Sequence, residues 1–121
     1  MYIGYDEKQE ELRQTLRAYY AELLTPEVQR ELGLGHGVGP TMRRIVRQMG
    51  EDGWLGIGWP KEYGGTGWDL MQRYIWTTEC GLANAPGTAP MGLGMCGPML
   101  IGHGTDEQRA FYLPRILSGE D

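Results

Sequence analysis

The chain has 121 residues, a length typical of a single domain. Glycine contributes 20 residues and proline 7, which brings the two together just below the roughly 25–30% that signals low-complexity sequence. A hydrophobic share of 40% with four tryptophans favours a folded chain, and the lack of a G-X-Y period excludes collagen. The net charge of −5 argues against nucleic-acid binding, and no apolar run reaches the roughly 18 residues that a membrane-spanning helix needs.

The N-terminal residues and the cysteines indicate a cellular compartment. Acidic residues lie within the first eleven positions, where a signal peptide would be basic and then apolar, so we expect a soluble, cytoplasmic protein. Cys80 and Cys96 are sixteen positions apart and have no Cys or His at the short spacing of metal ligands. This spacing argues against a zinc site and a disulfide framework, and we expect both cysteines to be small buried apolar residues.

The first half of the chain predicts two helices. Residues 6–24 have an amphipathic pattern, with Asp6 as a plausible N-cap and Thr25-Pro26 as the end. Its apolar positions are Leu12, Leu16, Tyr19, Tyr20 and Leu23. Residues 33–40 have glycine at every second position, which predicts a mobile loop. A second helix is expected from Pro40-Thr41 through Ile45, Val46 and Met49 to Gly50 or Gly53.

The second half predicts a structured loop and two or three further helical segments. Residues 53–69, GWLGIGWPKEYGGTGWD, alternate glycines with tryptophan and isoleucine anchors. Asp69 is expected to cap a helix that ends near Leu82, and residues 84–90 break it before a glycine-rich apolar segment at 91–104. Thr105 and Gln108 fit the capping box of a final helix that contains Pro114, which predicts a lost hydrogen bond or a kink, and ends at Gly119. Because no strand pattern is present, we predict an all-α fold, an up-and-down helical bundle with glycine-rich loops.

Several motifs have both a functional and a structural interpretation. Arg43, Arg44 and Arg47 resemble a phosphate clamp, although a solvated helix face is favoured. Residues 92–97 match G-x-G-x-x-G, but a dinucleotide site needs a preceding strand, and no strand is expected there. His36, His103 and Glu62 have no neighbouring residues typical of a catalytic group, so structural or surface roles are favoured. The residues alone therefore predict no catalytic group, cofactor site or metal site.

Two motifs resemble a known family. Gly53, Trp54, Gly56 and Pro60, followed by the run Glu-Tyr-Gly-Gly-x-Gly at 62–67, are similar to the N-terminal helical domain of flavin-dependent acyl-CoA dehydrogenases. The segment GTDEQRAFYLPRILSGE at 104–120 resembles the end of the same domain, at the proper separation. The resemblance covers nearly the whole chain and implies that residues 1–121 are this domain, without the β-domain that holds FAD and without the C-terminal helical domain.

The resemblance also implies an activity. The family removes the α-proton of an acyl-CoA thioester and passes a hydride from the β-carbon to FAD, which gives the trans-2-enoyl-CoA. Electrons then leave through an electron-transferring flavoprotein, and the intact enzyme is expected to be a homo- or hetero-tetramer. No residue of this chain is assigned as the catalytic base or as the main flavin site, so these 121 residues alone are expected to be inactive.

In the family, this domain supplies one wall of the acyl-chain cavity. The segment that aligns with this wall begins at Thr88 and ends at Met99, and the expected substrate-binding residues are Thr88, Met91, Gly92 and Met95. Steps of three or four residues place them, with Met99, on one face of a helix, where thioethers are adaptable and Gly92 leaves room for a ligand. An ordinary core stripe remains an open alternative for the same residues.

Two other functions remain open. The chain could be a free-standing helical interaction module that docks a partner through its tryptophans and its glycine-rich helix. It could also be one chain of a split, hetero-oligomeric dehydrogenase.

Overall fold

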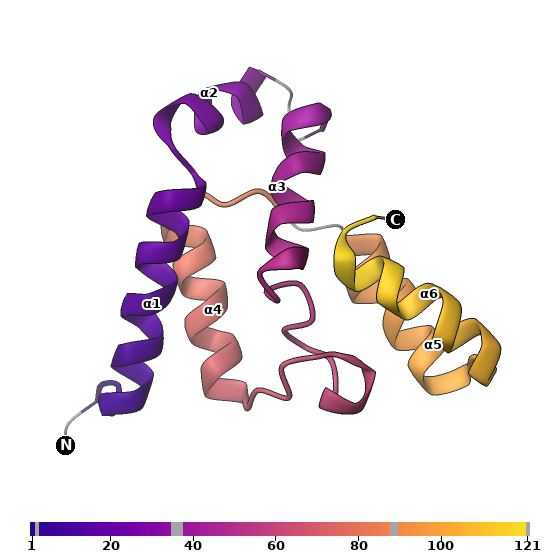
Figure 1. Ribbon diagram of the computed structural model, residues 1–121. Helices are drawn as coiled ribbons and strands as arrows, with labels where there is room; N and C mark the ends of the chain where they lie inside the picture. The colour runs from indigo at the N-terminus through magenta and orange to yellow at the C-terminus, as the bar shows by residue number, and fades with distance from the viewer. Residues whose placement is uncertain (2, 35–37, 88–89, 121) are drawn as a thin grey trace.

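The computed structural model describes residues 1, 3–34, 38–87 and 90–120. These residues form helices and no strand, which confirms the all-α prediction. The elements are α1 (Glu7–Leu23), α2 (Pro26–Leu34), α3 (Pro40–Glu51), η1 (Lys61–Tyr63), α4 (Leu70–Leu82), η2 (Met91–Cys96), α5 (Gly97–His103) and α6 (Asp106–Ser118). Figure 1 shows α1 beside α4 and α5 beside α6, with α3 between the two pairs and α2 across the end of α1 and α3.

Three helices begin at capping boxes. In each box the N-cap side chain accepts a hydrogen bond from the backbone N–H three residues later, and the side chain of that later residue accepts one from the N-cap N–H. The N-caps are Asp6, Asp69 and Thr105, each paired with the glutamine three residues later. At the other end of α6, Gly119 has a φ of 74°, the left-handed conformation that glycine adopts at low cost. These observations confirm the predicted caps at Asp6, Asp69 and Thr105 and the predicted terminator at Gly119.

The helix α2 was not expected from the sequence. Thr25-Pro26 ends α1, as predicted, but it also begins α2, because proline suits the first helical position and Thr25 Oγ1 accepts a hydrogen bond of 3.3 Å from the Val28 N–H. Gly33 therefore lies in a helix, and the predicted loop at 33–40 was wrong at its start. His36 lies outside the described residues.

The core has two parts. The first part draws on α1 and the residue after it, α2, α3 and the loop after α3, and consists of Tyr20, Leu24, Val28, Ile45, Val46, Met49 and Leu55. The second part lies around α5 and α6 and consists of Trp59, Leu100, Leu113 and Ile116. The expected core residues of α3, which are Ile45, Val46 and Met49, are all buried.

The loop at residues 53–69 is structured, as predicted, and backbone hydrogen bonds within the loop stabilise it. Leu55, Ile57 and Trp59 are buried and anchor it. The Thr66 N–H donates to the Gly56 carbonyl at 3.0 Å, and the Gly65 N–H donates to the Pro60 carbonyl at 3.0 Å. A Cβ atom at Gly65 would lie 2.0 Å from the Trp59 carbonyl oxygen, so only glycine fits there.

Candidate functional site

The segment predicted to line a cavity presents its methionines to the outside of this chain. The side chains of Met91, Met95 and Met99 are 74%, 67% and 54% exposed. The alternative of an ordinary core stripe is therefore wrong for these three residues. Gly92 lies between them and the core, where a Cβ would be 3.4 Å from Ile116 Cγ2. Thr88 lies outside the described residues.

An α-helix was expected in this segment, but η2 is a π-helix. Its last turn is closed by the Gly97 N–H, which donates to the Gly92 carbonyl five residues earlier. Proline at position 98 explains part of this difference, because it has no N–H to continue the regular α-helical pattern across the junction with α5. The prediction that residues 91–99 share one face assumed α-helical spacing throughout, and that assumption was wrong over η2.

Trp59, from the structured loop, contacts η2 directly. Its indole Nε1–H donates to the Leu93 carbonyl at 2.9 Å. The same ring fills the space beside Gly97, where a Cβ would lie 2.0 Å from Trp59 Cζ2. Sequence reasoning treated Trp59 only as a loop anchor and missed this contact, although Gly97-Pro98 after a glycine-rich run was a signal for an irregular helix.

A cavity of about 380 Å³ opens beside this contact. Pro90, Leu93, Gly94 and Pro98 line one side, and tryptophans with Arg73 line the other. A Cβ at Gly94 would meet nothing within 4 Å, so the backbone is accessible there. From Pro90 to Gly104 the sequence has no Asp, Glu, Lys or Arg, so this face is suited to an apolar group.

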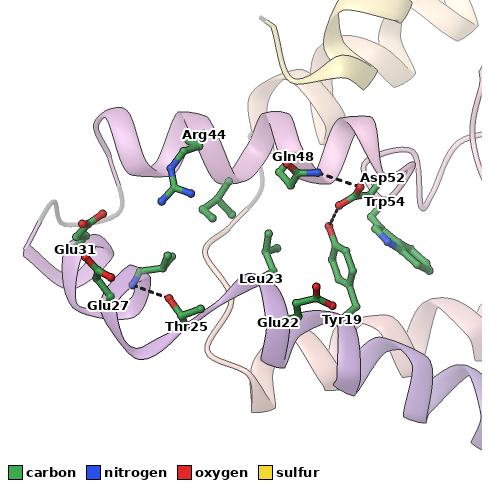
Figure 2. Close-up of a pocket in the computed structure, with 12 residues that line it drawn as sticks. Tyr19, Glu22, Leu23, Thr25, Glu27, Glu31, Arg44, Gln48, Asp52 and Trp54 are labelled. Carbon is green, nitrogen blue, oxygen red and sulfur yellow. Dashed lines mark hydrogen bonds between the residues drawn. The ribbon is translucent and has the colours of Figure 1, made fainter.

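A larger hollow of about 890 Å³ lies among α1, α2 and α3 and has a different character. Figure 2 shows Tyr19 and Gln48 converging on Asp52, with Glu22, Glu27 and Glu31 along the lining. Tyr19 Oη donates to Asp52 Oδ2 at 2.8 Å, and Gln48 Nε2 donates to Asp52 Oδ1 at 3.1 Å. Burial and this hydrogen bond raise the pKa of Tyr19 above its ordinary value, so the phenol stays protonated. The hollow shares only Trp54 with the cavity beside η2.

Comparison with known proteins places these features in a family. Residues 6–120 match the family described as acyl-CoA dehydrogenase, N-terminal domain. The chain belongs to this family. Among curated relatives, acyl-CoA dehydrogenase FadE26 of Mycobacterium tuberculosis is 46% identical over 99% of this chain and 30% of its own length. The mitochondrial isovaleryl-CoA dehydrogenase of Bos taurus is 30% identical over 97% of this chain and 28% of its own length.

Solved structures agree with the sequence relatives. The ChsE4-ChsE5 complex from Mycobacterium tuberculosis matches with a TM-score of 0.86 and 44% identity, over 99% of this chain and 30% of that chain. The steroid ACAD Tcur3481-Tcur3483 matches with a TM-score of 0.84 and 40% identity, over 99% of this chain and 31% of that chain. This acyl-CoA dehydrogenase domain thus spans about 30% of the length of the relatives it matches.

The remaining candidate residues of the acyl-CoA dehydrogenase domain take no part in the face at η2. Arg43, Arg44 and Arg47 are exposed on α3, which fits the solvated-face interpretation. Glu62 is exposed on η1, and His103 is the exposed last residue of α5. Within the described ranges, no group of three or more His, Cys, Asp or Glu side chains could hold a metal ion, and no helix is long and apolar enough to cross a membrane.

The two cysteines differ from the prediction. Cys96 is exposed on η2, so its expected burial was wrong, and Cys80 is only partly buried. Cys80 Sγ lies 2.8 Å from Tyr20 Oη, which gives the thiol a polar partner inside the core. Burial raises the pKa of the Cys80 thiol and also that of the Tyr20 phenol, so both groups stay protonated at neutral pH.

Proposed function

We propose that the full-length protein is a flavin-dependent acyl-CoA dehydrogenase and that η2 and the start of α5 form one wall of its acyl-chain cavity. The proposed wall residues are Thr88, Met91, Gly92 and Met95. The observation that carries this proposal is a row of exposed methionines on a segment without charged residues, in a chain of this family. Such an uncharged, thioether-lined face suits the hydrocarbon part of an acyl-CoA thioester.

The proposed reaction is oxidation of the Cα–Cβ bond of the acyl group to a trans-2-enoyl-CoA, and bound FAD supplies the hydride acceptor. The described face at η2 does not fit FAD itself, because the segment from Pro90 to Gly104 has no Lys or Arg to meet the pyrophosphate and Arg73 is the one cation among the described lining residues of the cavity. The flavin site and the catalytic base are therefore assigned to a β-domain and a C-terminal helical domain outside residues 1–121. The role of this domain is to bind and orient the acyl chain and to exclude water from it.

We also propose that this chain is one subunit of a hetero-oligomer, a tetramer in its complete form. Support comes from the solved relatives, which are two-protein complexes, one of them described as a steroid ACAD. By the same likeness, a steroid-linked acyl-CoA is the proposed substrate class, and an electron-transferring flavoprotein is the proposed electron acceptor. No specific observation favours a free-standing interaction module, and the cytoplasmic location stays a prediction from the sequence.

The proposal is tested with purified protein in two forms, the full-length protein with its partner subunit and residues 1–121 alone. We expect flavin absorbance and acyl-CoA-dependent dye reduction from the full-length assembly and neither from residues 1–121. A full-length assembly that binds flavin, but in which none of the acyl-CoA thioesters supports dye reduction, would refute the proposed activity. Turnover by residues 1–121 alone would refute the assignment of the flavin and the base to other domains.

A further inference from the structure

The Leu93 carbonyl lies at a point where helical hydrogen bonding fails. In an α-helix this oxygen would accept from the N–H of residue 97, and in a π-helix from that of residue 98. The Gly97 N–H is bonded to the Gly92 carbonyl instead, and Pro98 has no N–H. Both regular donors are therefore unavailable to Leu93.

Trp59 supplies the missing donor. Its side chain is 4% exposed, and its indole N–H lies 2.9 Å from the Leu93 oxygen. The fit is specific on both sides, because the ring also occupies the space where any residue larger than glycine at position 97 would place its Cβ. The Trp59 side chain thus replaces the donor that Pro98 lacks, and its ring leaves room only for glycine at position 97.

Trp59 is itself fixed by the structured loop. The Gly67 N–H donates to the Trp59 carbonyl at 3.2 Å, and Gly65 packs directly against the Trp59 backbone. A continuous set of contacts therefore leads from the Glu-Tyr-Gly-Gly loop through Trp59 to η2.

The π-helical geometry determines where the exposed methionines point. A π-helical turn contains one residue more than an α-helical turn, so its loss would rotate η2 relative to α5 by about 100° around the helix axis. Met91 and Met95 lie before the junction with α5 and would turn with η2, whereas Met99 lies after it.

We propose that Trp59 is a positioning residue that determines acyl-group specificity: its bond to the Leu93 carbonyl holds η2 as a π-helix and so fixes where Met91 and Met95 face the acyl chain. This inference rests on the proposed acyl wall. It assigns no contact between Trp59 and the substrate, since Trp59 acts through η2.

The test uses the full-length enzyme with its partner subunit and four variants. Trp59→Phe removes the indole donor and keeps an aromatic ring, and Pro98→Ala restores a backbone N–H near the Leu93 carbonyl. The third is the double variant. The fourth, Trp68→Phe, is the matched control, because Trp68 lies in the same loop, packs against other tryptophans and donates no hydrogen bond within the described part of the chain.

Two measurements are made on each variant: the melting temperature, and kcat and KM for octanoyl-CoA and for a steroid-linked acyl-CoA. We expect Trp59→Phe to lower the melting temperature and to change the ratio of the two kcat/KM values about tenfold, mainly through KM. Adding Pro98→Ala should recover part of the lost melting temperature, because the Leu93 carbonyl regains a donor. Trp68→Phe should leave the substrate ratio unchanged, because Trp68 is not among the residues that line the cavity beside η2.

Each contrary outcome has a definite meaning. Strictly additive melting-temperature changes in the double variant would overturn the role of the Trp59–Leu93 bond. Met95→Trp, a fifth variant, tests the acyl wall itself. An unchanged substrate ratio in Trp59→Phe, together with a changed ratio in Met95→Trp, would overturn the positioning role and leave the acyl wall standing. If neither variant changes the ratio, the acyl wall fails, and the inference fails with it. If Trp59→Phe does not fold, Gly97→Ala decides instead, because its Cβ would lie 2.0 Å from Trp59 Cζ2 and should displace the indole from the Leu93 carbonyl. Gly97→Ala should then shift the substrate ratio, and an unchanged ratio would overturn the positioning role.

Discussion

Arg17 on α1 donates two hydrogen bonds to the carboxylate of Glu79 on α4. Arg17 Nε lies 3.1 Å from Oε2 and Nη2 lies 3.1 Å from Oε1, so the pair is bidentate. The Glu79 side chain is 3% exposed and that of Arg17 is 55% exposed. The two residues are 62 positions apart in sequence, and their ion pair joins α1 to α4. The buried carboxylate depends on Arg17 as its counter-charge.

Replacing Arg17 should therefore cost stability in a way that a surface ion pair does not. We expect Arg17→Met to lower the free energy of unfolding by about 1–3 kcal/mol, because it leaves a buried carboxylate without its partner. The control is Arg13→Met, which removes an ion pair between neighbouring turns of α1 and should cost clearly less, because solvent screens this pair. Urea unfolding of both variants measures the difference. Equal losses of unfolding free energy would show that the burial of Glu79 does not make the Arg17–Glu79 pair more stabilising than an exposed pair.

The glycines of the structured loop give a second prediction. Gly65→Ala places a methyl group against the Trp59 backbone and should destabilise the domain by about 2 kcal/mol or more. Gly58→Ala, in the same loop, meets only an Arg73 side-chain nitrogen at 3.9 Å and should change stability by less than about 0.5 kcal/mol. Thermal unfolding followed by circular dichroism distinguishes the two. A tolerated Gly65→Ala would contradict the close approach of the loop to itself.

The two thiols should react at different rates. Cys96 is exposed, whereas burial raises the pKa of the Cys80 thiol, so iodoacetamide at pH 8 should modify Cys96 roughly tenfold faster. Mass spectrometry of each cysteine-containing peptide measures the rates, and labelling in urea, where the two should react alike, is the control. Similar rates in the folded protein would be inconsistent with the burial of Cys80 beside Tyr20.

The same thiol predicts a pH dependence of stability. Because the folded-state pKa of Cys80 is raised, its contribution is complete below the ordinary thiol pKa of about 8.5 and declines as the pH rises above it. A Cys80→Ser variant should lose less stability than the parent between pH 8 and pH 10, as measured by urea unfolding at each pH. Identical slopes in the two proteins would argue that Cys80 does not titrate differently on folding.

Helix ends were predictable where one side chain satisfies the backbone locally. The caps at Asp6, Asp69 and Thr105 need only a residue and its neighbour three positions on, so the sequence is sufficient. Thr25-Pro26 both ends α1 and begins α2. Interpreted only as the end of α1, these two residues gave no prediction of α2. Thr25 as N-cap and Pro26 as first helical residue were both visible in the sequence.

The candidate site was predictable in composition but not in geometry. The methionines of residues 91–99 could be identified from the sequence as one group, and the structure shows that Met91, Met95 and Met99 are exposed. The π-helix was not predictable from η2 alone, because it depends on a hydrogen bond from Trp59, 34 positions earlier. Burial of Cys96 failed as a prediction for another reason, because the apolar pattern does not say which side of a glycine-rich helix faces the core.

The most direct test of the proposed acyl wall is the substrate profile of Met95→Trp in the full-length enzyme with its partner subunit. Leu82→Trp is the matched control, since Leu82 is 69% exposed on α4 and Met95 is 67% exposed on η2. The measurement is kcat/KM across acyl-CoA thioesters of increasing size. We predict that Met95→Trp shifts the preference toward shorter acyl groups by about tenfold or more, while Leu82→Trp leaves it unchanged. A Met95→Trp profile that equals that of the parent enzyme would contradict the proposed acyl wall.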